Sequence, residues 1–154
     1  MNSDQKKSED INGDASRPVL TLGIVSQLSG IPTHSIRQYI DKGLLIPHKL
    51  ENNRQLFCMN DVNRLKHIHQ LIHEKGLNFA GIRALLAMVP CWEIHECSDK
   101  DRQNCDAYEA DYIPCWDASN KGRICKNEEC RECEVYTCLS HTTNLKSVLK
   151  NALK

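Results

Sequence analysis

The sequence predicts a mainly α-helical protein: a winged helix-turn-helix domain of four helices and a small β hairpin, then a small irregular cysteine-rich module and a short C-terminal helix. Three observations lead to this fold class. Apolar residues recur at helical spacing in four N-terminal segments, two short runs among them suit a hairpin, and eight of the nine cysteines cluster near the C-terminus. We expect a polar tail over 1–16, the winged-helix domain over 17–89, the module over 90–138 and the terminal helix over 139–154.

The charges of the chain are unevenly distributed, although its formal net charge is zero. Residues 17–89 carry nine Lys or Arg against four Asp or Glu, whereas residues 90–138 carry six against twelve. The last sixteen residues add three Lys and no acid. A basic segment followed by an acidic one is typical of a nucleic-acid reader joined to a second unit.

The N-terminal tail over 1–16 is almost wholly polar, so we expect it to be disordered. No stretch has the length of apolar residues needed to cross a bilayer, and the N-terminus lacks an apolar signal core. We therefore expect no membrane partner and a cytoplasmic location. Thiols stay reduced there, and clustered cysteines more often bind metal than form disulfides.

Two short helices separated by a tight turn are predicted near the start of the basic segment. Thr21 can cap a helix over 22–29 that ends at Gly30, and a second helix begins at Pro32 and ends near Gly43. This is the helix-turn-helix arrangement. The second helix is expected to present polar side chains that can reach phosphates and base edges, namely His34, Ser35, Arg37 and Gln38.

A hairpin and two further helices complete the predicted domain. Asn52 and Asn53 suit the turn of a small wing, which could carry Arg54 to the DNA backbone. A third helix is predicted from about 61 to 75, with Arg64 outside its apolar face. The fourth is capped by Asn78 and ends before Pro90.

Several motifs in residues 20–89 resemble the N-terminal domain of the MerR family of transcriptional regulators. They are Thr21-Leu22-Gly23, Gly30, Ser35-Ile36-Arg37-Gln38-Tyr39, Gly43-Leu44-Leu45, Arg54, Phe57 and Asp61. The segment Gly76-Leu77-Asn78-Phe79-Ala80-Gly81-Ile82-Arg83 is similar to the heat-shock repressor branch.

The resemblance implies a homodimer that reads a palindromic double-stranded operator, where it could meet RNA polymerase at the promoter. It also implies that Arg37 and Tyr39 on the recognition helix and Arg54 on the wing touch DNA. The DNA-binding residues expected from the pattern and the resemblance together are Thr33, His34, Ser35, Arg37, Gln38, Tyr39 and Arg54.

The sequence departs from the family pattern at several positions. Ile40 stands where the family usually has an acid, Phe57 replaces a tyrosine, and Cys58 takes a helix-capping position usually filled by Ser or Thr. The long helix that forms the family's dimer should begin near residue 90, where this chain has Pro-Cys-Trp. A helix within residues 139–154 could supply a short substitute.

The cysteine density between residues 91 and 138 indicates a metal-binding module. Only Cys130 and Cys133 have the two-residue spacing of a zinc ribbon, so a ribbon with two such pairs is not predicted. His95 and His141 adjoin the module as secondary ligand candidates, and Cys58 is interpreted as a structural residue. The candidate ligands are Cys91, Cys97, Cys105, Cys115, Cys125, Cys130, Cys133 and Cys138.

The module also resembles the two-CW module found at the ends of some bacterial sensory proteins. Two Cys-Trp pairs, Cys105 between them and the closing pair of cysteines occur in order, whereas Cys138 lies outside the pattern. Trp92 and Trp116 would shield a bound centre from solvent.

The sequence leaves open which centre the cysteines form. We weigh an iron-sulfur cluster first, structural zinc second and a metal-free thiol-disulfide switch third. The leading hypothesis is a DNA-binding transcriptional regulator that senses redox state or a metal. The alternative is an architectural or excisionase-like DNA-binding protein with a purely structural zinc module. No nucleophile and base are arranged as in an enzyme.

Overall fold

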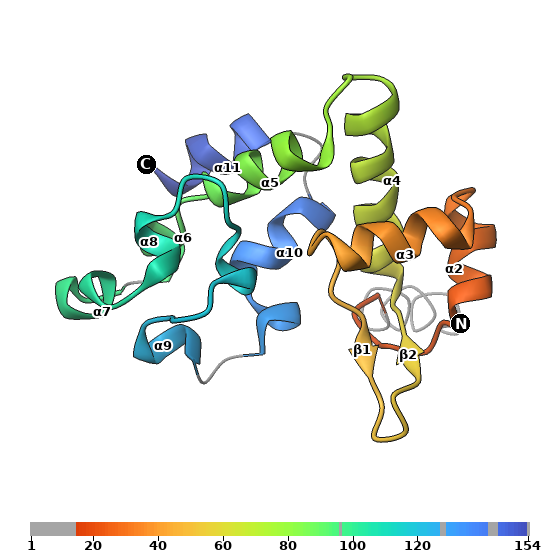
Figure 1. The fold of residues 1–154 in the computed structure, drawn as a ribbon, viewed down its shortest axis with the longest axis horizontal. Coiled ribbons are helices and arrows are strands. Elements are labelled where there is room, and N and C mark those ends of the chain that lie inside the picture. Colours follow the sequence, from red (N-terminus) through yellow and green to blue (C-terminus); the bar gives the residue numbers. More distant parts are fainter. Residues whose placement is uncertain (1–14, 96, 127–128, 142–144, 154) are drawn as a thin grey trace, which may run out of the picture.

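The computed structural model describes residues 15–95, 97–126, 129–141 and 145–153. The expected disordered tail falls almost entirely outside these residues. Helices dominate the described chain (Figure 1). In order the elements are α2 (Leu22–Ser29), α3 (Thr33–Asp41), β1 (His48–Lys49), β2 (Gln55–Leu56), α4 (Met59–His73), α5 (Phe79–Ala87), α6 (Cys91–Ile94), α7 (Asp99–Gln103), α8 (Asp106–Glu109), η1 (Cys115–Asp117), α9 (Arg123–Lys126), η2 (Cys130–Glu132), α10 (Glu134–His141) and α11 (Leu145–Ala152).

The helix-turn-helix unit is formed by α2 and α3, as the sequence predicts. The Thr21 hydroxyl accepts a hydrogen bond from the Ile24 backbone N–H and caps α2. Gly30 ends the helix at φ 74°, a left-handed conformation that costs glycine little. The recognition helix α3 follows after a short turn.

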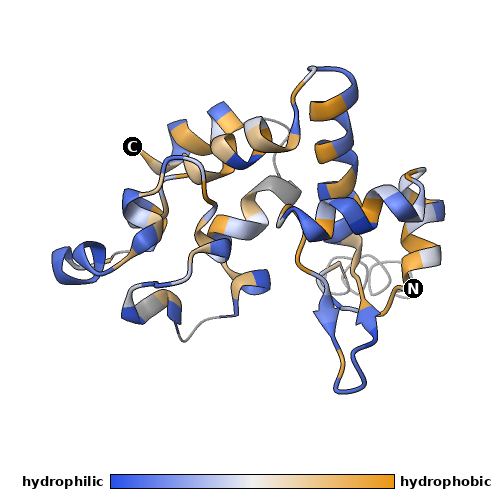
Figure 2. Ribbon diagram, in the orientation of Figure 1, coloured by the Kyte–Doolittle hydropathy of each residue, from blue (hydrophilic) through white to orange (hydrophobic). Residues whose placement is uncertain are grey.

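The wing is an antiparallel hairpin of β1 and β2, in which His48 pairs with Leu56 and Lys49 with Gln55. Asn53 sits at the turn with φ 63°, and the Asn52 side chain accepts a hydrogen bond from the Arg54 N–H. The two asparagines therefore form the turn that the sequence predicts. Figure 2 shows that the wing is largely hydrophilic.

The third helix, α4, runs from Met59 to His73, so it begins and ends two residues earlier than the expected bounds. The Asp61 carboxylate accepts a hydrogen bond from the Cys58 N–H at 2.9 Å, and the Cys58 side chain completes a capping box with the third residue of the helix. Cysteine thus fills a position where a hydroxyl is usual. After α5, capped by Asn78, the chain forms only the four-residue α6, so no long helix starts at residue 90.

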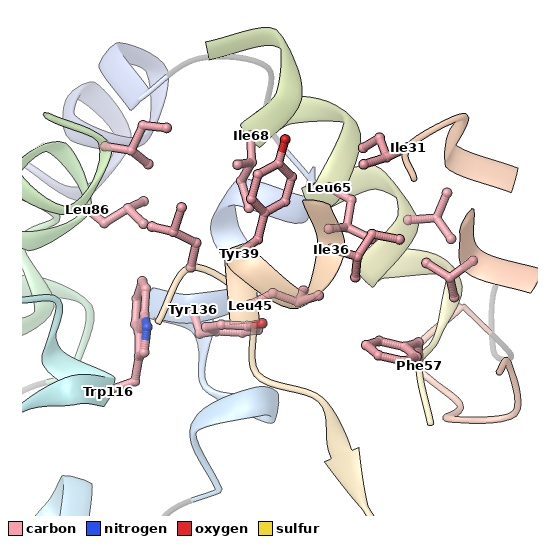
Figure 3. Close-up of a cluster of buried hydrophobic side chains, with 14 residues drawn as sticks. Ile31, Ile36, Tyr39, Leu45, Phe57, Leu65, Ile68, Leu86, Trp116 and Tyr136 are labelled. Atoms are coloured by element: carbon pink, nitrogen blue, oxygen red, sulfur yellow. The ribbon is translucent and has the colours of Figure 1, made fainter. Parts of the chain in front are cut away.

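One hydrophobic core joins the winged helix and the cysteine module. Trp116 and Tyr136 are buried in the same cluster as residues of α2, α3 and α4 (Figure 3). Helix α10 packs against α4 and runs through the expected boundary after residue 138. The buried members of the cluster are Val25, Ile31, Ile36, Tyr39, Leu44, Leu45, Phe57, Val62, Leu65, Ile68, Ile82, Leu86, Trp116 and Tyr136.

The C-terminal helix α11 packs against its own chain. Val148 is buried with Val89 and Val135 in a second, smaller cluster. Leu153, at the end of this segment, is exposed. None of the helices in the described chain is both long and apolar enough to cross a membrane.

Candidate nucleic-acid interface and cysteine cavity

The outer face of the recognition helix carries polar side chains, as a DNA-reading surface requires. His34, Arg37 and Gln38 are exposed, whereas Thr33 and Ser35 are half-buried. Arg54 is exposed on the wing, next to the turn. These side chains come from two elements that the α3–β1 linker, residues 42–47, connects directly.

The resemblance implies that Tyr39 touches DNA, but its side chain is buried in the structure. Its side chain is only 3% exposed, and its ring meets the Phe79 ring edge-on with 6.0 Å between centroids. Its hydroxyl lies 3.4 Å from Nδ1 of His69 on α4. Burial raises the pKa of Tyr39. The side chain therefore anchors α3 to α4 and α5 and is turned away from the outer face.

Seven of the eight module cysteines line one cavity, together with the aromatic rings of Trp92, Tyr108, Trp116 and Tyr136. The Trp92 and Tyr108 rings meet at right angles, 5.6 Å apart. His95 also borders the cavity. The seven are Cys91, Cys97, Cys105, Cys115, Cys125, Cys130 and Cys133.

The thiols of the cavity are close enough to disfavour one another's ionisation. Burial, and then the neighbouring thiols of Cys97 and Cys105, raise the pKa of Cys91 to about 11. The same kinds of cause raise the pKa of Cys125 to about 12, and that of Cys115 strongly. A cation among these sulfurs would reverse the effect, because positive charge favours thiolates.

The donor set of the cavity suits more than one kind of centre. In the described part of the chain, no three His, Cys, Asp or Glu side chains are placed to hold one metal ion. Seven thiols surround the shared cavity, and thiolates are ligands of both zinc and iron-sulfur clusters.

Two cationic or polar side chains lie against the cavity sulfurs. The His95 Nε2 is 2.8 Å from the Cys133 Sγ, and the Lys121 Nζ is 3.5 Å from the Cys130 Sγ. Lys121 also donates to the Trp116 carbonyl. Hydrogen bonds of this kind to sulfur tune a bound centre. The other secondary candidate, His141, has its side chain outside the described part of the structure.

Two cysteines stand apart from the cavity. The Cys138 thiol donates to the Val135 carbonyl at 3.1 Å and packs between the two apolar clusters. Cys58 is buried at the start of α4. None of the nine cysteines forms a disulfide. Cys138, also predicted as a ligand, is the one of the eight module cysteines that does not line the cavity.

Arg64 is the feature that sequence reasoning missed most clearly, because the helical pattern placed it outside the buried face of α4. It is 0% exposed. Its Nε donates to the Leu44 carbonyl at 2.7 Å, and its Nη1 donates to the Tyr136 carbonyl at 2.6 Å. The guanidinium lies 3.8 Å from the centre of the Tyr136 ring and 5.1 Å from that of Trp116. An arginine of the winged helix is therefore held by two aromatic rings of the module.

A buried ion pair makes a second connection between the two parts. The Arg131 Nη2 of the module lies 3.0 Å from the Asp61 Oδ2 of α4, and both side chains are largely buried. Arg131 also donates to the Ile46 carbonyl. No local pattern signals this pair, since its partners are 70 residues apart.

The comparison with known families decides the identity of the N-terminal half. The model described as MerR HTH family regulatory protein matches residues 20–89. Residues 20–89 are a MerR-family helix-turn-helix domain. The resemblance that the sequence motifs indicate is thereby confirmed for the MerR-type domain, including its α2–α3 unit and wing.

Two of the relatives of the MerR-type domain are named as transcriptional regulators, and a third is named as a heat shock protein. The HTH-type transcriptional regulator GlnR of Bacillus anthracis is 40% identical over 73 residues, which are 47% of this chain and 56% of that protein. The heat shock protein HspR of Streptomyces coelicolor is 30% identical over 71 residues, 46% and 47% of the two chains. The HTH-type transcriptional regulator HmrR of Rhizobium leguminosarum is 32% identical over 89 residues, 56% and 60%. The chain thus spans about half the length of the curated relatives it matches, and the heat-shock branch is among them.

Proposed function

We propose that this protein is a cytoplasmic transcriptional regulator that binds double-stranded DNA through its MerR-type domain and senses redox state or a metal through an iron-sulfur cluster. The observation that carries the proposal is the position of the cysteine cavity. Seven thiols surround it, and two of its walls, Trp116 and Tyr136, belong to the core of the DNA-binding domain. A centre in this cavity therefore contacts side chains that also support the recognition helix.

The DNA side of the proposal rests on the MerR-type domain and its exposed polar side chains. Arg37 on α3 and Arg54 on the wing are accessible to phosphates, and Gln38 is accessible to base edges. A homodimer would place two such surfaces on a palindromic operator, near RNA polymerase at the promoter. Since α5 is followed by the short α6, that dimer would need another surface than a long helix at residue 90.

The sensing part of the proposal rests on the cysteine side chains that line the cavity. Cys91, Cys115 and Cys125 are half-buried thiols whose pKa values are raised, and a bound cation would offset this effect and favour their thiolates. A bound iron-sulfur cluster would supply one-electron redox chemistry. Trp92 and Tyr108 would exclude water from it, and His95 and Lys121 are placed to donate hydrogen bonds to its sulfur ligands.

A purely structural zinc site is the second candidate. The closing pair Cys130 and Cys133 has zinc-ligand spacing, and the His95 ring lies beside Cys133. In that case the module would only complete the fold of an architectural DNA-binding protein. The signature would be one zinc per chain and a DNA affinity that does not respond to oxidants.

Anaerobic purification followed by metal and acid-labile sulfide analysis tests the proposal. We expect iron and sulfide in comparable amounts, with visible absorbance that is lost on exposure to air or chelator. If the protein is colourless and contains stoichiometric zinc and no sulfide after expression with ample iron, the cluster is wrong and the structural zinc site is correct. Metal replacement with cobalt would then report the number of thiolate ligands.

A further inference from the structure

We infer that the cysteine module controls DNA binding within a single chain, by holding the α3–β1 linker that sets the recognition helix against the wing. This inference rests on the proposed function, because it names how the state of the cavity reaches the DNA. The module side chains that hold the linker are called the latch here, and they are Trp116, Arg131 and Tyr136.

The latch forms hydrogen bonds with backbone groups of two linker residues, Gly43 and Ile46. The Trp116 Nε1 donates to the Gly43 carbonyl at 2.6 Å, and the Ile46 N–H donates to the Tyr136 hydroxyl at 2.8 Å. Arg131 donates to the Ile46 carbonyl. These backbone groups are partly buried, and their partners come from a segment about 70 to 90 residues later in the chain. Displacing the latch would leave the linker without them.

Each latch residue follows a cavity cysteine by one to three positions in the sequence. Trp116 follows Cys115 within η1, and Arg131 follows Cys130 within η2. Tyr136 lies one helical turn after Cys133 and itself lines the cavity. Any movement of these sulfurs on ligation or oxidation is therefore transmitted to the latch through one to three residues of backbone.

On the domain side, the latch packs closely against Arg64 and the linker. The guanidinium of Arg64 on α4 lies over the Trp116 and Tyr136 rings, and it also donates to the Leu44 carbonyl of the linker. At Gly43, with φ 72°, a Cβ atom would collide with the Asp117 carboxylate. Close packing of this kind allows alternative discrete arrangements and little continuous deformation.

Substitutions of latch side chains test the latch while leaving every cavity cysteine in place. Trp116→Phe removes the donor to Gly43, and Tyr136→Phe removes the acceptor for Ile46 while keeping the ring beside Arg64. Tyr112→Phe is the matched control, since Tyr112 is an exposed tyrosine of the same module that does not line the cavity. Iron, sulfide and thermal midpoint are measured for each variant, and then the affinity for a duplex selected from random DNA, with and without the cluster.

We expect the wild type and Tyr112→Phe to change affinity about tenfold on cluster removal, a typical coupling between sites. The latch variants should keep the cluster and lose most of that change. Hydrogen exchange of residues 42–47 in the wild type should become faster when the cluster is removed. If latch variants respond as the wild type does, or if exchange in the linker is unchanged, the inference fails. A wild type without any cluster would instead contradict the proposed function.

Discussion

The guanidinium of Arg64 and the ring of Tyr136 lie 3.8 Å apart, although they are 72 residues apart in the sequence. One belongs to the MerR-type domain and the other to the cysteine module. Because Arg64 also reaches the Leu44 carbonyl, this single side chain connects α4, the linker and α10. The two parts of the chain thus share one interior.

Arg64→Met should destabilise the protein by about 3 kcal/mol, because it removes two charge-assisted hydrogen bonds and a desolvated cation–π contact. Urea unfolding measures the change. Lys66→Met is the matched control, since Lys66 is exposed on the same helix, and its effect should stay within about 0.5 kcal/mol. A loss below about 1 kcal/mol in Arg64→Met would contradict the role assigned to this contact.

Arg37→Ala and Arg54→Ala should each weaken binding to all duplexes by about 1 kcal/mol and reduce the salt dependence. Gln38→Ala should instead change which sequences are preferred. Fluorescence anisotropy against selected and random duplexes distinguishes these effects. Lys100→Ala removes a charge from exposed α7 in the module and should leave binding unchanged. Equal binding by the wild type and both arginine variants would show that DNA uses another surface.

Cys115→Ser should abolish or strongly reduce iron and sulfide content, whereas Cys138→Ser should retain both. Cys115 is surrounded by four other cavity thiols, whereas Cys138 does not line the cavity and its thiol donates to the Val135 carbonyl. Metal and sulfide analysis of the two purified variants makes the comparison. Iron retained in Cys115→Ser and lost in Cys138→Ser would reverse the assignment of ligand and structural cysteine.

Metal binding should release protons and strengthen as pH rises from about 6.5 to 8, because thiols must become thiolates to ligate. Burial and neighbouring thiols raise the pKa of Cys91 to about 11 and of Cys125 to about 12, so both are protonated throughout this range. Calorimetric titration with zinc as the probe, in buffers of different ionisation enthalpy, counts the protons. Binding without proton release would show that these thiols are not the ligands.

The sequence was sufficient to predict the four helices and the hairpin of the DNA-binding domain, because each carries local signals. Thr21 and Gly30 bound α2, Asn53 forms the wing turn, and Asn78 caps α5. Tyr39 shows the limit of transfer from a family. The resemblance implies that it touches DNA, whereas its side chain is buried in the structure.

The joined core could not be predicted, because its contacts are between distant residues of unlike type. An arginine such as Arg64 is usually exposed, and nothing near it in the sequence indicates two aromatic partners. The same is true of the Asp61–Arg131 pair. Cysteine density indicated the module, yet the separation of Cys138 from the cavity depends on how α10 packs against α4.

The decisive measurement is the affinity of one anaerobic preparation for its selected duplex, before and after removal of the cluster. All 154 residues are used, and the molecular mass in solution is recorded for both samples. We predict that affinity changes by about tenfold while the MerR-type domain stays folded. Equal affinity of the two samples, at the same mass and helical content, would contradict a sensing role for the cysteine cavity.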